Sequence, residues 1–298
     1  MEAEQPTVLI TGLHGFTGCY LAERLRARGV RVVGLVQPGT TGEVSCDLTD
    51  AQAVRAAVHA LQPTHVAHLA AFSFVGHEDV RGIYDVNLLG TLDLLEALST
   101  LPTPPQRILL AGSANIYGTP NIEVIDESIC PAPVNHYAIS KLAMELMARN
   151  YASRLPLVIT RPFNYSGRGQ SGRFLIPKIV SHALRKAPFI ELGNLDVSRD
   201  FSDVRDVAAI YTALLLDAPD AVGKTFNICS GQAYSLREIL QMVEDISGHS
   251  MEVRVNPAFV RSNEVPRLLG SNALLRQHTG LAPQIPLHET LRWMLGVE

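Results

Sequence analysis

A glycine-rich turn stands directly after the first apolar run of the chain, in the segment VLITGLHGFTG at residues 8–18. The apolar run predicts a buried strand, and residues 16–28 have the pattern of a helix. Gly12 would permit a tight turn, Gly15 would let the backbone approach a diphosphate, and Gly18 would let helix and strand pack closely. The diphosphate would lie on the helix N-terminus, where free N–H groups and the helix dipole favour an anion. This order of elements predicts a dinucleotide-binding unit at the start of the chain.

Short apolar runs and helical patterns alternate through the first half of the chain. Helices are expected near residues 16–28, 50–61 and 82–99 and around Tyr137, and the apolar runs between them are VRVVGLV, THVAHLA, RILLAGS and LPLVITRPF. Apolar strands separated by helices of this length indicate βαβ units and a parallel sheet covered on both faces. The fold class expected is therefore α/β, with a Rossmann-type, doubly wound parallel sheet.

The character of the sequence changes after Phe163, where the segment NYSGRGQSGR is too polar for a core. We expect a dinucleotide-binding Rossmann domain over residues 1–165 and a smaller α/β substrate-binding lobe over residues 166–194 and 231–298. Residues 195–230 are expected to return to the first domain, because GKTFNIC resembles a further strand of its sheet. The smaller lobe would then be discontinuous.

Charge and cysteine usage exclude several classes of function. The 298 residues carry a net charge of −4 and no basic block, so neither nucleic acid nor an anionic membrane surface is favoured as a partner. The four cysteines are scattered and the histidines lack metal-ligand spacing, so we expect no metal site and no disulfide framework. The acidic start lacks the basic region of a signal peptide, and no apolar run approaches the length of about 18 residues typical of a membrane span. We therefore expect a cytoplasmic protein.

The residue that would read the adenosine ribose stands at the end of the second predicted strand, in LVQPG. An acidic residue there would bind the 2′-hydroxyl of NAD, and a nearby arginine would take the 2′-phosphate of NADP. Gln37 is neither, so both cofactors stay open. Asp47, in CDLTD, is a candidate for the adenine edge; the alternative is a loop aspartate that caps a helix.

The segment HYAISKLAME, at residues 136–145, places Tyr137 and Lys141 one helical turn apart. Side chains with this spacing lie over each other on one face of a helix. By itself the pattern is open to two interpretations: a catalytic pair, or an amphipathic helix with a packed tyrosine and a solvated lysine.

Five motifs together carry a resemblance to a known family: TGLHGFTG, HLAA, SANIYG, YAISK and RPFN. They resemble the extended short-chain dehydrogenase/reductase family that acts on nucleotide sugars, and the resemblance covers almost the whole chain. Within that family, GNLDVSRDFSDVRDV, FNICSGQ and RSNEVPRLLGS are most similar to the GDP-4-keto-6-deoxymannose reductases and their GDP-mannose 4,6-dehydratase relatives.

The resemblance implies a catalytic set of Ser113, Tyr137 and Lys141. Hydride delivery to a ketone leaves an alkoxide that needs a proton, which Tyr137 would supply, while Ser113 would hydrogen-bond the reacting oxygen. A tyrosine with an ordinary pKa of about 10 exchanges protons poorly near neutrality. We expect Lys141, together with the charge of the oxidised nicotinamide, to lower the pKa of Tyr137.

The neighbours of Ser113 predict which reaction is absent. The dehydratase relatives carry an acid just after the matching serine or threonine, and here Ala114 and Asn115 follow instead. Neither side chain titrates, so we expect no elimination of water. Glu127 is the remote carboxylate that could replace the missing acid.

The resemblance also implies which residues bind the cofactor and the substrate. The residues expected at an NADH or NADPH are Gly12, Gly15, Phe16, Thr17, Gly18, Gln37, Asp47, Leu48, Leu69, Ala70, Ala71, Asn87, Tyr137, Lys141 and Pro162. Arginine forks suit a diphosphate. The residues expected at a GDP-sugar are Ser113, Asn164, Arg173, Arg199, Arg261 and Glu264.

The activity implied is the NAD(P)H-dependent reduction of the 4-keto group of a GDP-4-keto-6-deoxyhexose to a GDP-6-deoxyhexose such as GDP-rhamnose. The alternatives are a nucleotide-sugar 4-epimerase with the same three residues and a non-catalytic NAD(P)-binding regulatory protein. The helices near 82–99 and around Tyr137 carry apolar residues beyond one face, which predicts a two-fold homodimer. Packing within the sheet layer is the other explanation for these residues: Leu88, Leu89, Leu92, Leu95, Leu142, Leu146 and Met147.

Overall fold

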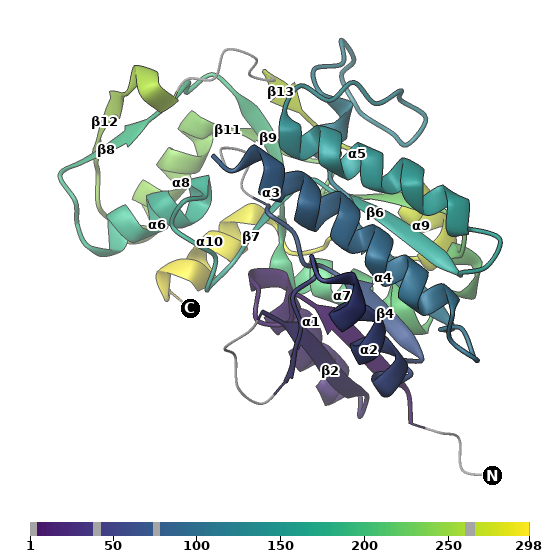
Figure 1. Cartoon of the computed structure of the whole chain (residues 1–298). Helices are drawn as coiled ribbons and strands as arrows, with labels where there is room; N and C mark the ends of the chain where they lie inside the picture. Colours follow the sequence, from purple (N-terminus) through teal and green to yellow (C-terminus); the bar gives the residue numbers. More distant parts are fainter. Residues whose placement is uncertain (1–4, 38–42, 74–77, 260–265, 298) are drawn as a thin grey trace.

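The computed structural model describes residues 5–37, 43–73, 78–259 and 266–297. It has a large lobe around a seven-stranded sheet and a smaller lobe with two short sheets (Figure 1). Within the described residues, none of the helices is long and apolar enough to cross a membrane.

All neighbouring strands of the large sheet are parallel. Their order is β10-β6-β5-β4-β1-β2-β3, so the chain reverses its direction of travel across the sheet between β1 and β4. In open α/β sheets, ligands bind at such a switch point, outside the carboxyl ends of the strands. The strands are β1 (Thr7–Thr11), β2 (Arg31–Val36), β3 (Val44–Ser45), β4 (His65–His68), β5 (Arg107–Ala111), β6 (Leu157–Pro162) and β10 (Thr225–Ile228).

Helices cover both faces of this sheet, as its apolar strands require. The helices α1 (Phe16–Ala27) and α7 (Val204–Leu216) pack with one set of sheet side chains. The helices α2 (Ala51–Leu61), α4 (Gly90–Ser99) and α5 (His136–Ala148) pack with the other set. The predicted Rossmann-type α/β fold is confirmed, with one difference: the single helix expected near 82–99 is α3 (Val80–Tyr84), a π-helical turn (Asp85–Leu89) and α4.

The smaller lobe has its own core of apolar side chains. Its four-stranded sheet pairs β9 (Ser198–Asp203) with β7 (Asn164–Ser166), β11 (Ala233–Ser235) and β13 (Arg267–Leu268). Its remaining elements are β8 (Phe189–Leu192), which pairs with β12 (Glu252–Val255), and the helices α6 (Leu175–Leu184), α8 (Leu236–Ser247) and α10 (Leu287–Leu295).

Residues 195–230 are shared between the two lobes. The strand β9 belongs to the four-stranded sheet, whereas α7 packs on α1 and β10 forms the edge of the large sheet beside β6. The division of the chain that we propose therefore places β9 with the smaller lobe, and α7 and β10 with the Rossmann domain.

Candidate active site

The glycine turn between β1 and α1 has the geometry of a cradle for a dinucleotide. Gly12 has a φ of +74°, and a Cβ atom there would lie 2.9 Å from the backbone nitrogen of Ala70. A Cβ atom at Gly18 would lie 2.2 Å from the carbonyl oxygen of Gly12, so only glycine lets α1 begin this close to the turn before it. Gly15 is the N-cap of α1, and no side chain caps the helix. The first N–H groups of α1 thus have no side-chain acceptor and are oriented for an anion.

The ends of β1 and β4 are joined by a buried threonine and a buried histidine. The hydroxyl of Thr11 accepts hydrogen bonds from the backbone N–H groups of Leu69 and Ala70, both at 3.2 Å. His68 Nδ1 lies 2.7 Å from the same hydroxyl. These contacts hold the loop after β4 against the glycine turn, where Ala70 and Ala71 present only methyl groups.

Asn87 supports this loop with all of its polar side-chain atoms. Its Oδ1 accepts a hydrogen bond from the backbone N–H of Phe72 at 2.9 Å, and its Nδ2 donates to the Phe72 carbonyl at 3.2 Å and to Ser140 Oγ at 3.1 Å. Asn87 therefore ties the loop after β4 to α5. Its expected contact with the cofactor stays a prediction.

Near the end of β3, the structure excludes one of the two interpretations of Asp47, and its expected contact with the adenine stays a prediction. The N-cap of α2 is Asp50, whose carboxylate accepts the N–H groups of Gln52 and Ala53. The carboxylate of Asp47 accepts the N–H and the hydroxyl of Thr49, and these hydrogen bonds lower its pKa. The helix-capping interpretation of Asp47 is therefore wrong, and an exposed carboxylate remains near the end of β3. Gln37 is exposed just after β2, and Leu48 contacts Gly90 of α4.

Tyr137 and Lys141 lie in the first two turns of α5, which begins at the N-cap Asn135. Tyr137 is 7% exposed and Lys141 is 3% exposed, so the alternative of a solvated lysine is wrong. Lys141 Nζ donates a hydrogen bond of 2.7 Å to the carbonyl of Ala111, at the end of β5. Ser113 follows two residues later, and its side chain is a neighbour of Tyr137 that acts to lower the pKa of the tyrosine. The structure thus brings together the three predicted catalytic residues at the carboxyl end of β5.

The lowering of the Tyr137 pKa expected from Lys141 together with an oxidised nicotinamide stays a prediction, and the protein's own residues act on this pKa as follows. Burial raises the pKa of Tyr137 to about 12, although the hydrogen bond with Ser113 acts in the opposite direction. Burial also lowers the pKa of Lys141 to about 8, against the effect of the Glu145 carboxylate. Loss of hydration thus outweighs the neighbouring charge, and the Lys141 ammonium group is directed to the Ala111 carbonyl. The Tyr137 hydroxyl is therefore protonated at neutral pH, the form that can deliver a proton.

Glu127 does not supply the missing acid at Ser113. Its Oε1 accepts the backbone N–H of Asn227 at 2.7 Å, on the edge strand β10. Because β6 separates β10 from β5, this hydrogen bond holds the carboxylate at the outer edge of the sheet.

A buried polar network beneath the site was not predicted from the sequence. Arg161 on β6 forms an ion pair of 2.8 Å with Glu145 on α5 and donates a hydrogen bond of 2.9 Å to the hydroxyl of Tyr117. The Tyr117 hydroxyl in turn donates to Asn227 Oδ1 at 2.8 Å. The sequence did offer a signal for this network. Arg161 is a charged residue within an apolar strand, and a buried charge needs a buried partner.

Tyr165 on β7 is a second residue that the sequence analysis missed. Its hydroxyl shares a hydrogen bond of 2.7 Å with Thr17, and its ring is stacked on Phe16. Phe16 and Thr17 are the first two residues of α1, so Tyr165 links the cofactor cradle to the strand that follows the predicted residue Pro162.

The predicted substrate residues lie in several places. Asn164 is on β7, where its Nδ2 donates to the carbonyl of Asp200 on the paired strand β9 at 3.4 Å. Arg199, also on β9, is half-buried and donates to the carbonyls of Ser198 and Pro266. Arg173 is exposed before α6. Arg261 and Glu264 lie outside the residues that the structure describes.

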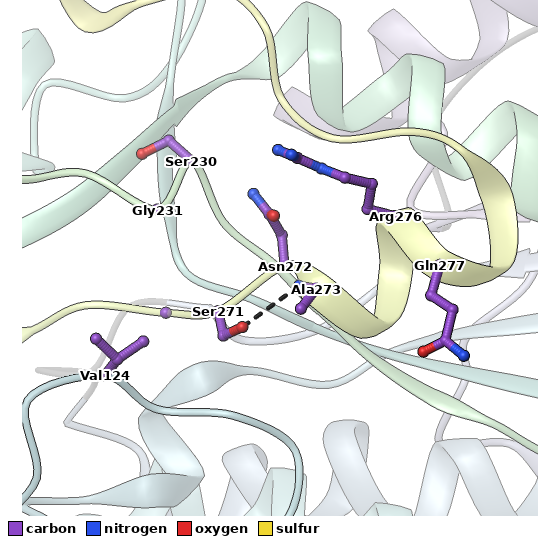
Figure 2. Close-up of a pocket in the computed structure, with 9 residues that line it drawn as sticks. Val124, Ser230, Gly231, Ser271, Asn272, Ala273, Arg276 and Gln277 are labelled. Atoms are coloured by element: carbon purple, nitrogen blue, oxygen red, sulfur yellow. Dashed lines mark hydrogen bonds between the residues drawn. The ribbon is translucent and has the colours of Figure 1, made fainter.

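A groove of about 610 Å³ lies elsewhere, between the loop after β10 and the start of α9 (Ala273–Thr279) (Figure 2). The side chains of Asn272 and Arg276 lie along it, and Ser271 Oγ accepts the N–H of Ala273 (Figure 2). Of the predicted catalytic, cofactor and substrate residues that the structure describes, none lines this groove. In the described part of the chain, no cluster of three or more His, Cys, Asp or Glu side chains could hold a metal ion.

A family model described as GDP-mannose 4,6 dehydratase matches residues 9–294. The chain belongs to this family. Its members use nicotinamide cofactors, so the chain is an NAD(P)-dependent enzyme, and the glycine cradle fits that group.

Two curated relatives cover nearly the whole chain. The GDP-6-deoxy-D-talose 4-dehydrogenase of Aggregatibacter actinomycetemcomitans is 37% identical over 90% of this chain and 89% of its own length. The GDP-6-deoxy-D-mannose reductase of Pseudomonas aeruginosa is 33% identical over 97% of this chain and 96% of its own length.

Two solved structures are similar to this chain in both sequence and fold. A Burkholderia cenocepacia J2315 protein provisionally described as an epimerase is 51% identical, with a TM-score of 0.92 over 98% of this chain and 97% of that one. A Pseudomonas aeruginosa structure complexed with NADPH is 32% identical, with a TM-score of 0.85 over 98% of each chain.

Proposed function

We propose that this enzyme reduces the 4-keto group of a GDP-4-keto-6-deoxyhexose with NADPH or NADH and forms a GDP-6-deoxyhexose. The observation that carries this proposal is a buried Tyr137 with the buried Ser113 as a side-chain neighbour and the buried Lys141 on the next turn of α5. Two relatives whose names refer to GDP-6-deoxyhexoses support the choice of sugar. We also keep the sequence-based expectation of a cytoplasmic protein.

The proposed mechanism assigns one task to each residue. The reduced nicotinamide, when bound, supplies the hydride for C4. Tyr137 donates a proton to the C4 oxygen, and Ser113 donates a hydrogen bond to the same oxygen as negative charge develops on it. Lys141 places a cation beside the tyrosinate that remains, and its pKa of about 8 lets it exchange a proton near neutrality.

The direct test is to mix the protein with GDP-4-keto-6-deoxymannose and NADPH or NADH, and to follow the absorbance of the reduced cofactor. We expect one cofactor oxidised for each sugar reduced. The product must also be identified by NMR, because the sugars named for the two relatives, 6-deoxytalose and 6-deoxymannose, differ in configuration at C4. Isomerisation of a nucleotide sugar without net oxidation of the cofactor would instead support the alternative of a 4-epimerase; the 51% identical protein is provisionally described as an epimerase.

The reaction of the dehydratase relatives should be absent. Dehydration needs groups that move protons at C5 and C6, and each proton transfer contributes about 10² to 10⁴ in rate. Ala114 and Asn115 cannot move a proton, and Glu127 is bound at β10. We therefore expect no 4-keto-6-deoxy product from GDP-mannose, measured by mass spectrometry. Robust formation of that product would contradict the proposal.

Replacement of Tyr137 should separate chemistry from binding. In Tyr137→Phe the proton donor is removed, so kcat should fall by about 10² or more. Cofactor affinity, measured by quenching of protein fluorescence, should be largely retained. A variant with near-normal kcat would exclude Tyr137 from the mechanism.

A further inference from the structure

We propose that Asn115 is a positioning residue that leaves Ser113 able to act only as a hydrogen-bond donor, so that Tyr137 keeps its proton for the substrate. This inference rests on the proposed reduction and deepens it. Sequence comparison treats Asn115 only as the neutral replacement of an acid. The structure gives its amide a contact of its own within the catalytic set.

The contact is a pair of hydrogen bonds to one oxygen. Ser113 Oγ accepts the backbone N–H of Asn115 at 3.2 Å and its side-chain Nδ2 at 3.1 Å. A hydroxyl group has two lone pairs and one hydrogen. Because both lone pairs are taken by the same residue, the hydrogen is the only part of the Ser113 hydroxyl left for another partner.

The backbone of Asn115 is held on both sides. Ser113 is the N-cap of a 3₁₀ helix, Ala114–Tyr117, that starts three residues after the end of β5. Ile116 and Tyr117 are fully buried, and the Tyr117 hydroxyl is fixed by Arg161 and Asn227. This anchoring fixes the backbone N–H of Asn115 and the direction of its half-buried side chain.

The consequence concerns the direction in which protons are shared. Ser113 is a side-chain neighbour of Tyr137, and the two hydrogen bonds from Asn115 leave the Ser113 hydroxyl only its hydrogen to offer. Ser113 has no lone pair left to accept the Tyr137 hydrogen. In the reduction, the hydride adds to C4 and the Tyr137 proton to the C4 oxygen, which gives an alcohol and leaves a tyrosinate. Ser113 keeps its own hydrogen, which it donates to the C4 oxygen while negative charge develops there.

An acid at position 115 would have the opposite effect. A carboxylate only accepts hydrogen bonds, so it would take the Ser113 hydrogen away from Tyr137 and from the substrate. A neutral amide donor at this position is therefore matched to a reductase, whose serine must stabilise an oxyanion.

A double-mutant cycle tests whether Asn115 acts through Ser113. With one hydrogen bond removed, Asn115→Ala should lower kcat about threefold to tenfold with KM changed less than about twofold. The Ser113→Ala substitution by itself should lower kcat by about 10² to 10³. In that background, Asn115→Ala should change kcat by less than about twofold. Equal losses in both backgrounds would overturn the inference, because they would show that Asn115 acts independently of Ser113.

Replacing the amide of Asn115 by a carboxylate should have a larger effect than removing it. Asn115→Asp keeps the shape of the side chain and should lower kcat by about 10² or more, since Ser113 would then donate to the new carboxylate. The matched control is Asn256→Asp, which makes the same chemical change in the smaller lobe at a residue whose Oδ1 accepts the N–H of Ala258. An Asn115→Asp variant as active as this control would contradict the proposed role.

A measurement on the free protein separates this inference from the proposed function. The side-chain amide signal of Asn115 in a ¹⁵N-labelled sample can be identified by its loss in Asn115→Asp. It should shift in Ser113→Ala and remain in place in Asn256→Asp. An unshifted signal in Ser113→Ala would overturn the inference whatever the substrate is, whereas an inactive wild-type protein with a shifted signal would contradict only the proposed reaction.

Discussion

His68 is an uncharged histidine in the middle of the large sheet. Its Nδ1 lies 2.7 Å from the Thr11 hydroxyl and its Nε2 lies 2.8 Å from the Thr91 hydroxyl. Burial lowers the pKa of His68 to about 3, and the charge on Lys141 adds to this effect. Between pH 6.5 and 3 the unfolded chain therefore binds a proton that the folded protein does not, so stability contributed by His68 falls as the pH falls. We expect the free energy of unfolding to decrease by about 1.4 kcal/mol per pH unit in this window from this residue alone.

Urea unfolding between about pH 6.5 and pH 4.5 measures this slope. In His68→Gln the residue no longer titrates, and the slope should decrease by about 1.4 kcal/mol per pH unit. The control His288→Gln makes the same substitution at a histidine whose side chain is 56% exposed. Equal slopes in wild type and His68→Gln would show that His68 is charged in the folded protein.

At the scale of the elements, the buried pair of Arg161 and Glu145 connects β6 with α5. The two side chains are 5% and 1% exposed, and Tyr117 extends the contact to the turn after Ser113. Arg161→Met should therefore lower the free energy of unfolding by about 3 to 5 kcal/mol, because it leaves the Glu145 carboxylate buried without its partner. Adding Glu145→Gln should restore at least half of that loss. Urea unfolding measures both values.

The exposed pair of Arg28 and Asp217 is the control for this prediction. Arg28 Nη1 lies 2.7 Å from Asp217 Oδ2, but both side chains are nearly half exposed. Arg28→Met should therefore lower the free energy of unfolding by less than about 1 kcal/mol. If the double variant at Arg161 and Glu145 is as unstable as the sum of the two single variants, the two residues do not stabilise each other.

At the scale of the whole molecule, α4 and α5 lie side by side on the outside of the large lobe (Figure 1). Leu89 is 47% exposed and Leu146 is 50% exposed. The other apolar residues from which the sequence predicted a homodimer are buried or partly buried in the protein's own cores: Leu88, Leu92, Leu95, Leu142 and Met147. Packing within the sheet layer therefore accounts for most of the set, and the dimer prediction now rests on the two exposed leucines.

The predicted dimer can be tested by light scattering at micromolar concentration. We expect a two-fold dimer, and we expect the double variant Leu89→Glu, Leu146→Glu to be a monomer because it would bury four charges in a two-fold interface. The control is Leu184→Glu on α6, where the replaced leucine is 58% exposed on the other lobe. A monomeric wild-type protein would contradict the prediction.

The sequence by itself determined the class of fold and the three catalytic candidates. Periodicity and turn chemistry are local, so apolar runs, helical patterns and the glycines of residues 12–18 were enough to predict the parallel sheet and its cradle. Tyr137 and Lys141 are four residues apart in one helix, which fixes their common face. Ser113 was placed by a family resemblance and by the strand before it.

The tertiary structure decided the environment of these groups. Burial raises the pKa of Tyr137, an effect that the spacing of Tyr137 and Lys141 does not reveal. The partner of Glu127 is Asn227, 100 residues away in the chain. Tyr117, two residues after Asn115, is hydrogen-bonded to Arg161 on β6 and Asn227 on β10. Such properties depend on distant residues brought together by folding, and a local pattern carries no information about which of them become neighbours.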